Sequence, residues 1–478
     1  METLSFSEGF VAGAILILVF IATVRWILNK DTSAGALVRK HFPKRAADGV
    51  DISERRFPAR VRADIQRAID ALPENGFQIV AFHGVQNDDH YQGLTLAGSM
   101  QWKDYPATIP AAYEDVDIGS NETIRVVKNG LWLLKQDEEP VAIMVSRLQT
   151  PCGPSYSVLH VQSYDTSAGK VAAKKIVDWL EAFIQEAPSY RGKILSLEAL
   201  EDAYSGAATG IRVHKLRDVE RDQIILPDST LKLLERNVIQ FTRNRAKLAS
   251  FGQSTRKGLL FYGPPGTGKT HTIHYLTRAL EGHTTLIISA EQVQDLADYM
   301  ALARLLQPSI VVLEDVDLIA RDRGEMHSPQ QESLLNKLLN EMDGLKEDAE
   351  ILFILTTNRP EALEAALASR PGRVDQAIEF PLPNEEGRAK LVQLYSLGMN
   401  LSPDCIAEIV RRTEGVSASF IKELMRRSVQ FHLEHNGSET VSREDVDNAL
   451  DEMLFHGGKL NLKLLGASSR IGYQTVEA

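Results

Sequence analysis

GLLFYGPPGTGKTHTIHYL, residues 258–276, is the most informative stretch of the chain. The apolar run Leu259–Tyr262 suits a buried strand, and Gly263–Thr270 fits the phosphate-binding pattern G-x4-G-K-[ST]. Glycines let such a loop curl so that its N–H groups face phosphate oxygens, and a helix starting near Lys269 adds its positive end. The strand before the loop and the helical pattern after it argue against a chance Gly/Pro turn. We therefore expect an α/β domain that binds a nucleotide.

The expected nucleotide contacts come from this loop and the first turn of the helix. Lys269 is expected to reach the outer phosphates, and Thr270 to offer its hydroxyl to magnesium. The predicted cofactor-binding residues are Gly263, Pro264, Pro265, Gly266, Thr267, Gly268, Lys269, Thr270 and His271.

Three later segments carry polar residues suited to the same chemistry. The buried-strand run Ile310–Leu313 is followed by Glu314-Asp315-Val316-Asp317, and acidic residues at a strand end can hold magnesium and polarise water. The run Ile351–Asn358 ends at Asn358, which is placed to orient an attacking water. Arg370 and Arg373 lie in a Pro-Gly turn and present cationic forks suited to a phosphate supplied across a subunit boundary. Alone, these would indicate an acidic turn, a capping Asn and surface arginines; in this order they predict a catalytic set.

In that order the motifs resemble the AAA branch of the AAA+ ATPase family over about Asp218–Leu454. GPPGTGKT is similar to Walker A, IVVLEDVD to Walker B, LTTNRP to sensor 1 and SRPGRVD to the arginine-finger turn. The resemblance implies a P-loop α/β domain at 211–382, a helical lid at 383–454, ATP and Mg²⁺ as cofactors, and a homo-oligomeric ring, usually a hexamer. It also implies that Arg370 and Arg373 act on the ATP of a neighbouring subunit. Further positions implied to lie near the nucleotide are Asp222–Ile224, Gly415, Ser417 and Ala418.

The chain departs from the family pattern at Walker B, which usually ends Asp-Glu. By position Glu314 takes the magnesium role together with Thr270, and Asp315 takes the role of catalytic base. The swapped order resembles the mitochondrial inner-membrane AAA translocases that move the folded Rieske protein. The text EMDGL resembles membrane AAA proteases, but no H-E-x-x-H occurs in the sequence. Ser289–Pro308 lacks the family's aromatic-apolar-Gly triad, for which Tyr299-Met300 is a weak substitute.

The N-terminal segment predicts a membrane-spanning helix at 9–28. Gly9–Val24 contains no charged residue, and the run extended to Leu28 has about the length that a bilayer requires. A signal peptide is disfavoured because Met1–Glu8 carries only acidic charge, and a buried core helix is the remaining alternative. Lys and Arg residues follow the span and none precedes it, so we expect the body on the cytoplasmic side, at a bacterial inner membrane or its equivalent.

Between this span and the nucleotide domain we expect a juxtamembrane linker, 29–57, and an α+β domain, 58–210, of unknown role. The domain begins with the helical pattern Pro58–Leu72 and carries a second amphipathic helix through Ala173–Ile184. Five β-rich runs lie between them, and Asn129-Gly130 predicts a hairpin between two of these runs. No catalytic constellation is present, and residues 455–478 form a tail.

Composition limits the functional classes. The chain has 478 residues, a formal charge of −11 and two cysteines, which fits globular domains and excludes a collagen or a disulfide scaffold. The acidic balance argues against nucleic acid as a partner. We expect a membrane-tethered ATPase that remodels, extracts or translocates protein substrates. The alternatives are an unfoldase partner of a separate protease and a slow nucleotide-gated scaffold that organises membrane complexes.

Overall fold

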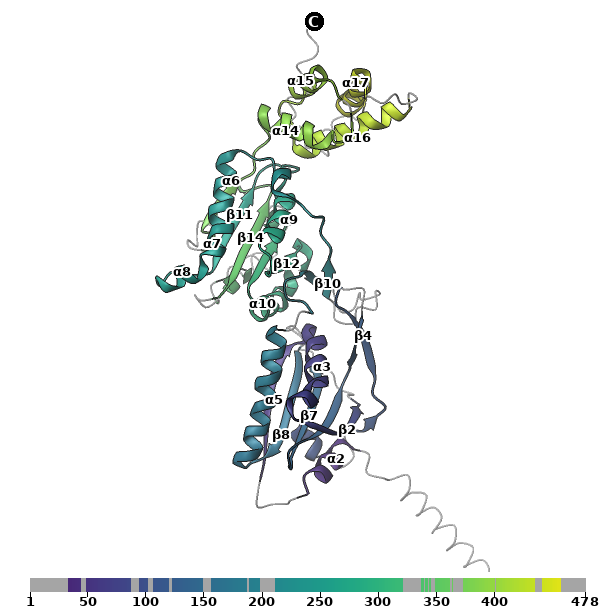
Figure 1. Cartoon of the computed structure of the whole chain (residues 1–478), viewed down its shortest axis with the longest axis vertical. Helices are drawn as coiled ribbons and strands as arrows, with labels where there is room; N and C mark the ends of the chain where they lie inside the picture. The colour runs from purple at the N-terminus through teal and green to yellow at the C-terminus, as the bar shows by residue number, and fades with distance from the viewer. Residues whose placement is uncertain are drawn as a thin grey trace, which may run out of the picture. The chain divides into compact units, whose positions relative to one another are not determined.

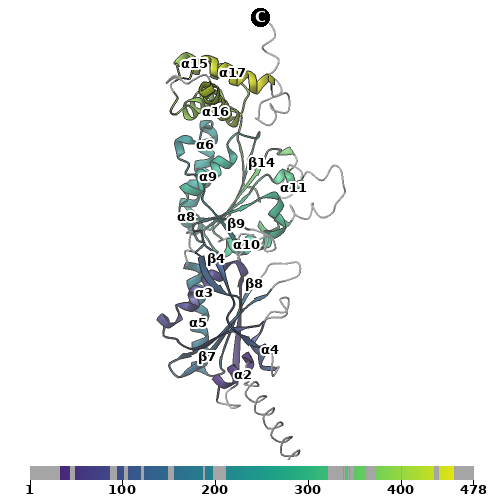
Figure 2. The same cartoon turned by 90° about the vertical axis from the view of Figure 1, so that its right-hand side faces the viewer.

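The computed structural model forms two compact units, drawn in Figures 1 and 2. The N-terminal unit comprises Met1–Ser189 with Glu198–Ile211, and the C-terminal unit comprises Tyr190–Leu197 with Arg212–Ala478. The structure describes residues 33–43, 49–86, 94–101, 106–119, 123–148, 156–186, 189–197, 211–320, 349–361, 373–399, 401–434 and 441–456, with isolated positions between 337 and 363. Within those ranges no helix is long and apolar enough to span a bilayer, and the span predicted at 9–28 lies outside them.

The N-terminal unit is built on a six-stranded sheet with the order β1-β8-β7-β6-β2-β3. Its neighbouring strands pair antiparallel. The strands are β1 (Val50–Pro58), β2 (Gln78–Val85), β3 (Thr108–Ile109), β6 (Gly130–Gln136), β7 (Glu139–Leu148) and β8 (Tyr156–Tyr164). A separate two-stranded sheet joins β4 (Tyr113–Asp117) to β5 (Thr123–Val127).

Helices cover both faces of this six-stranded sheet. Strand β8 is buried along almost its whole length, which explains its run of apolar and uncharged side chains. The long helix α5 (Ser167–Glu186) packs on β7 and β8 beside α3 (Arg62–Asp70), and α2 (Ala34–His41) packs with α4 (Leu96–Gln101) against the sheet (Figure 2). The predicted helical stripe of α5 is confirmed, since Ala173, Ile176 and Leu180 are buried. Short 3₁₀ turns, η1 (Ala59–Val61) and η2 (Leu72–Asn75), flank α3.

Two expectations for this region are wrong. Residues 29–57 are not simply a linker, because α2 contributes to the hydrophobic core and β1 pairs with β8 along its full length. The Asn129-Gly130 pair does not form a hairpin, since β5 pairs with β4 while β6 pairs with β2 and β7. Asn129 instead receives hydrogen bonds from Val85 and Arg147, which fixes the passage from the small sheet to the large one. The hairpin between β6 and β7 turns at Asp137, whose φ is 54°.

The C-terminal unit contains a seven-stranded sheet with the order β10-β9-β12-β13-β14-β11-β15. Along this order, each strand from β9 onward pairs parallel with the next, through β12, β13, β14 and β11 to β15. Their bounds are β9 (Ile194–Leu197), β10 (Ile211–His214), β11 (Lys257–Tyr262), β12 (Thr284–Ile288), β13 (Ser309–Leu313), β14 (Ile351–Thr357) and β15 (Gln376–Glu379). Strand β9 therefore belongs to this sheet and not to the preceding α+β domain that we expected to extend to residue 210.

Helices surround the parallel strands. The first group packs Leu234 and Val238 against β11 and comprises α6 (Asp228–Leu234), a π-helical turn η4 (Glu235–Gln240), α7 (Phe241–Arg243) and α8 (Arg245–Ser250). Helix α9 (Lys269–Ala279) follows the phosphate loop. The remaining helices are η3 (Arg221–Gln223), η5 (Ala290–Asp295), α10 (Leu296–Leu305) and α11 (Val316–Ala320).

A helical subdomain with its own core follows Pro383, where the lid was expected. Its members are α14 (Glu385–Tyr395), α15 (Pro403–Arg412), α16 (Ala418–Glu434), α17 (Arg443–Asp451) and a π-helical turn η7 (Glu452–His456), as Figure 2 shows for α15 to α17. Val392, Ile409, Phe420 and Leu450 meet in its core. Asn384, Ser402 and Ser442 cap α14, α15 and α17, so the sequence marks where each helix begins.

Candidate functional site

Three parallel strands end at the same edge of the sheet and bring the predicted site together. In the β-sheet register Tyr262 at the end of β11 lies opposite Thr357 of β14, and Leu313 of β13 lies opposite Leu355. The phosphate loop, the Glu314-Asp315 pair and Asn358 each follow directly after one of these ends. Parallel pairing therefore gathers residues that are up to about a hundred positions apart in sequence.

The phosphate loop adopts backbone conformations that favour glycine. Gly266 has a φ of 75° and Gly268 a φ of 100°, both in the left-handed region. The Thr267 hydroxyl donates to the Pro264 carbonyl at 2.9 Å and closes the loop, while Pro264 and Pro265 remain exposed. Helix α9 starts at Lys269, directly after this curl, so its free N–H groups face the loop.

Lys269 is buried and surrounded by neutral acceptors. Its ammonium donates to the Gly263 carbonyl at 2.8 Å, to the Pro264 carbonyl at 3.0 Å and to the Asn358 side-chain oxygen at 2.8 Å. Burial lowers the pKa of Lys269 to about 8, against the opposing influence of Asp315 and Asp317. Lys269 forms no ion pair with the residues that the structure describes, and a desolvated cation of this kind is suited to receive phosphate oxygens.

Thr270 and Glu314 supply the oxygen pair expected for magnesium. The Thr270 hydroxyl donates to Glu314 Oε1 at 3.0 Å, and Thr270 is exposed. Hydroxyl and carboxylate oxygens are the donors that Mg²⁺ prefers, so this pair fits the ion. No group of three or more His, Cys, Asp or Glu in the described part of the chain is arranged to hold a metal by itself.

Asp315 has an unusual backbone. Its φ is 50°, which is uncommon for a residue other than glycine and is tolerated best by Asn and Asp. Its N–H donates to Thr356 Oγ1 at 3.0 Å, and its Oδ1 receives the Asn358 amide at 3.0 Å. This conformation gives a physical reason for the swapped Walker B order, since a left-handed position after the strand favours Asp over Glu. Asn358 bridges Asp315 and Lys269, which ties the third motif to the first two.

A pocket of about 880 Å³ lies next to the loop, between the α/β part of the unit and its helical lid. Of the residues expected near the nucleotide, Gln223, Ile224 and Ala418 line this pocket, whereas Asp222, Gly415 and Ser417 do not. The pocket also includes residues that we did not anticipate: Arg217, His274, Leu391, Tyr395 and Lys422. The repeat of His271 at His274, one turn later on α9, was the sequence signal for the second histidine. Burial lowers the pKa of His271, while a hydrogen bond to the Gln223 backbone opposes this shift and nearby Lys422 and Arg217 strengthen it.

The lid contacts the phosphate loop directly. The Ser419 N–H donates to the Gly266 carbonyl at 3.1 Å, and the Ser419 hydroxyl donates to the same oxygen at 3.3 Å. A Cβ at Gly266 would lie 2.8 Å from Ser419 Oγ and 2.9 Å from Ser417 Oγ, so a side chain at 266 would push the lid away. The small residues at 417–419 therefore permit close approach of the lid to the loop.

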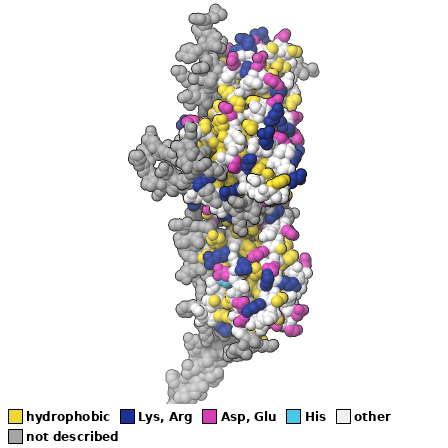
Figure 3. All heavy atoms as spheres, turned by 90° about the vertical axis from the view of Figure 1, so that its left-hand side faces the viewer, with side chains coloured by type: hydrophobic (Ala, Val, Ile, Leu, Met, Phe, Trp, Pro, Cys, Tyr) yellow, Lys and Arg dark blue, Asp and Glu magenta, His cyan; other side chains and the backbone are white. Residues whose placement is uncertain are grey.

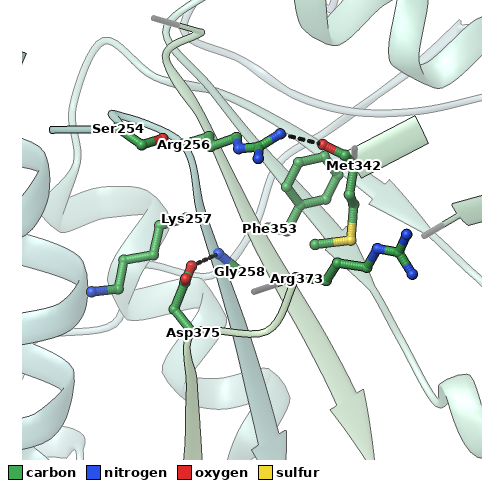
Figure 4. Close-up of a pocket in the computed structure, with 8 residues that line it drawn as sticks. All are labelled: Ser254, Arg256, Lys257, Gly258, Met342, Phe353, Arg373 and Asp375. Carbon is green, nitrogen blue, oxygen red and sulfur yellow. Dashed lines mark hydrogen bonds between the residues drawn. The ribbon is translucent and has the colours of Figure 1, made fainter. Parts of the chain in front are cut away.

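Arg373 does not lie at its own phosphate loop. It lines a small pocket at the start of β11 with Arg256, Gly258, Met342 and Asp375 (Figure 4). Asp375 accepts from the Gly258 N–H at 2.8 Å and fixes this turn against the first residues of the strand. Strand β11 has six residues and separates Arg373 from the loop by roughly 20 Å. Arg370 lies outside the described residues.

The interpretation of Tyr299-Met300 as a substitute for the family's substrate-gripping triad is wrong. Both are fully buried in α10, and the Tyr299 hydroxyl receives the Leu197 N–H at 2.8 Å and donates to Gln292 at 3.1 Å. They pack the core of the sheet and are inaccessible to a polypeptide.

On the molecular surface, acidic and basic side chains are interspersed over the described part of the face that Figure 3 shows.

Comparison with known proteins agrees with this geometry. Residues 259–382 match the AAA family, the ATPase family associated with various cellular activities. The chain is 31% identical over 248 residues to the ATP-dependent zinc metalloprotease FtsH of Synechococcus sp. (strain JA-2-3B'a(2-13)), covering 48% of this chain and 37% of that protein. It is also 31% identical over 249 residues to the chloroplastic ATP-dependent zinc metalloprotease FTSH 1 of Oryza sativa subsp. japonica, covering 48% of this chain and 35% of that protein.

The similarity is confined to one part of each protein. The chain spans less than two fifths of the length of these relatives. The family match at residues 259–382 includes the phosphate loop, the acidic pair and Asn358, which the structure brings to one sheet edge. Residues 259–382 are therefore an AAA domain, an ATPase module that uses ATP and Mg²⁺.

Proposed function

We propose that the chain is a membrane-tethered AAA+ ATPase that uses ATP hydrolysis to remodel, extract or translocate protein substrates. The observation that carries the ATPase part is the convergence of Lys269, the Thr270–Glu314 pair and the Asp315–Asn358 pair at one edge of a parallel sheet. The protein-remodelling part is supported by the similarity to proteins named ATP-dependent zinc metalloproteases, since a protease acts on proteins.

Each residue has a defined part in the proposed hydrolysis. Lys269 and the loop amides would hold the phosphates, and Thr270 with Glu314 would hold Mg²⁺, which would supply neutralisation of phosphate charge. A water oxygen forms a bond to the γ-phosphorus while the bond from that phosphorus to the β–γ bridging oxygen breaks. Asp315 accepts the proton that the water loses, and Asn358 holds the Asp315 carboxylate in position.

Arg373 supports a ring in which neighbouring subunits complete each site. The side chain belongs to the opposite end of β11 from its own loop, so its proposed target is a phosphate of an adjacent protomer. We propose a homo-oligomeric ring, with a hexamer as the family's usual size, and assign the same role to Arg370.

Mixed rings test this shared site. Arg373→Ala subunits keep their own Lys269, and Lys269→Ala subunits keep their arginines, so a mixture contains some intact sites although each variant alone has none. We expect phosphate release from the mixture to exceed that of either pure variant, in proportion to the fraction of complementary interfaces. Equal, negligible release at every mixing ratio would contradict a site shared between subunits.

The membrane tether is proposed from the uncharged run Gly9–Val24 and its extension to Leu28. Basic residues beyond the run support a body on the cytoplasmic side. Carbonate extraction of membranes and protease protection of each end test this topology. A chain released by carbonate would contradict the tether.

The substrate class is tested with a trap. An Asp315→Asn protein is expected to retain ATP and a bound substrate because hydrolysis no longer resets the ring. Cross-linking in cells followed by mass spectrometry should recover protein partners that depend on the substitution. The same partners at equal yield with Lys269→Ala would contradict ATP-dependent engagement.

A second candidate function follows from the comparison itself. The relatives are named zinc metalloproteases, whereas these 478 residues contain no H-E-x-x-H. An ATPase that unfolds substrates for a protease on a separate chain fits this combination. It predicts that the trapped partners include a peptidase. Turnover separates both candidates from a slow nucleotide-gated scaffold, for which phosphate release would stay near background.

A further inference from the structure

Asp317 is a buried carboxylate next to the hydrolysis residues, and the motifs assign it no role. It lies in the first turn of α11, two residues after Asp315, and is only 1% exposed. An acidic residue in the first turn of a helix ordinarily faces solvent and its own helix N–H groups. The bonds of Asp317 instead run to β14.

Both bonds of Asp317 fix the backbone where β14 ends. Its Oδ1 receives the Thr357 hydroxyl at 2.9 Å and the Asn358 N–H at 3.2 Å. The Thr357 hydroxyl oxygen in turn accepts the Arg359 N–H at 2.9 Å. The carboxylate therefore sets the position of the main chain on both sides of Asn358.

The Asn358 side chain is the link between the two halves of the site. Its oxygen accepts from Lys269 at 2.8 Å, and its nitrogen donates to Asp315 at 3.0 Å. An amide that must meet a lysine and a carboxylate at once tolerates little displacement, because hydrogen bonds weaken steeply as distance and angle depart from ideal values. Any group that fixes the Asn358 backbone thus also fixes the spacing of Lys269 and Asp315.

We propose that Asp317 is a positioning residue for ATP hydrolysis, acting through Asn358 to hold the Asp315 carboxylate and Lys269 at their working separation. The inference rests on the ATP hydrolysis proposed above. Among the described residues the hydrogen bonds of Asp317 run to Thr357 and Asn358 and none runs to the phosphate loop, so we class it as a positioning residue and not as a catalytic one.

The test compares Asp317→Asn and Asp317→Ala in the full chain, each alone and together with Asn358→Ala. Asparagine keeps an oxygen acceptor for Thr357 and Asn358, whereas alanine removes it. We expect Asp317→Asn to retain kcat within about threefold and Asp317→Ala to lower kcat about tenfold or more, with KM for ATP changed far less. In the Asn358→Ala background we expect Asp317→Ala to have little further effect on kcat, because the residue through which it acts is gone.

The matched control is Asp445→Ala. Asp445 is also a buried carboxylate and also binds a hydroxyl, that of Ser442 at 2.8 Å, but it lies in the lid helix α17. The Asp445→Ala substitution should lower the thermal unfolding midpoint and leave kcat per folded molecule unchanged. If Asp317→Ala does not fold, Thr357→Val replaces it, since this change removes the hydroxyl that Asp317 binds and keeps the shape of the strand residue.

Three outcomes would overturn the inference. They are an undiminished kcat in Asp317→Ala, an Asp317→Asn variant as impaired as Asp317→Ala, and a loss from Asp317→Ala that is equally large with and without Asn358. A wild-type protein that releases no phosphate would instead reject the proposed function, so the two failures are distinguishable.

Discussion

The two units of the chain bury positive charge in different ways. In the N-terminal unit Glu114 of β4 forms ion pairs with the buried Arg62 and with Lys128. In the C-terminal unit Lys269 donates to two carbonyls and one amide, and forms no ion pair among the described residues. A cation matched by a carboxylate is already neutralised and stabilises structure, whereas a cation held by neutral groups retains its attraction for an incoming anion.

Sheet topology adds a second difference. The antiparallel strands of the N-terminal unit place their ends alternately at opposite edges of the sheet, so no edge gathers the residues that follow them. The parallel strands β11, β13 and β14 all end at one edge, where Gly263, Glu314 and Asn358 follow. This explains why short motifs predicted a site in the C-terminal unit and none in the N-terminal unit.

The largest expected effect concerns Lys269. Replacing it with Ala removes a charge-assisted contact to the phosphates, and we expect ATP affinity to fall on the order of 100-fold or more. Titration with a fluorescent ATP analogue measures this. Circular dichroism should show an unchanged fold. Retained affinity in the Ala variant would show that Lys269 is a structural cation like Arg62.

The next effect concerns the left-handed residue at the end of β13. Asp315→Glu restores the residue type that the family usually has as catalytic base, yet we expect it to lower kcat about tenfold because Glu is disfavoured at a φ of 50° and its longer arm displaces Asn358. Steady-state phosphate release measures the change. A gain in kcat would show that backbone conformation does not determine the choice of Asp here.

A pH dependence follows from the burial of Lys269. Its pKa is lowered to about 8 in the free protein, and bound phosphates raise it again by favouring the charged form. ATP affinity should therefore be constant below pH 8 and fall as pH rises through 8, by about tenfold per unit, because binding then requires uptake of a proton. Calorimetric titrations at several pH values measure this. Lys269→Arg should give a flat profile, since Arg stays charged; a flat profile in the wild type would contradict the lowered pKa.

The smallest effect on ATP turnover is expected from the N-terminal unit. Arg62→Met leaves Glu114 with less compensation in a mostly buried position and should destabilise that unit by about 3 kcal/mol. Because the bond lies within the N-terminal unit, kcat for ATP should stay unchanged. Chemical denaturation and phosphate release on the same preparations measure the two quantities. A parallel loss of ATPase activity would mean that the paired cation also serves the nucleotide site.

Sequence reasoning predicted the parts of the chain in which local pattern and tertiary structure agree. The phosphate loop is encoded by glycines at positions that need left-handed backbone, and the strands before it and before Glu314 are uninterrupted apolar runs. These features depend on neighbours within a few residues.

The remaining features depend on pairing over long sequence separations. Asn129-Gly130 has hairpin composition, but strand pairing elsewhere determined its role. Strand β9 joined the parallel sheet because it pairs with β12, about ninety residues later. Asp317 gained its importance from Thr357 and Asn358, which no local pattern connects to it.

Release of inorganic phosphate by the purified full-length protein, with ATP and Mg²⁺, tests the central claim most directly. We expect sustained release by the wild type, and none above background by Asp315→Asn although it binds ATP with wild-type affinity. Glu314→Gln serves as the companion, since impaired hydrolysis in it alone would shift the catalytic base by one residue. A folded wild-type protein that binds ATP and releases no phosphate, or an Asp315→Asn variant as active as the wild type, would contradict the account.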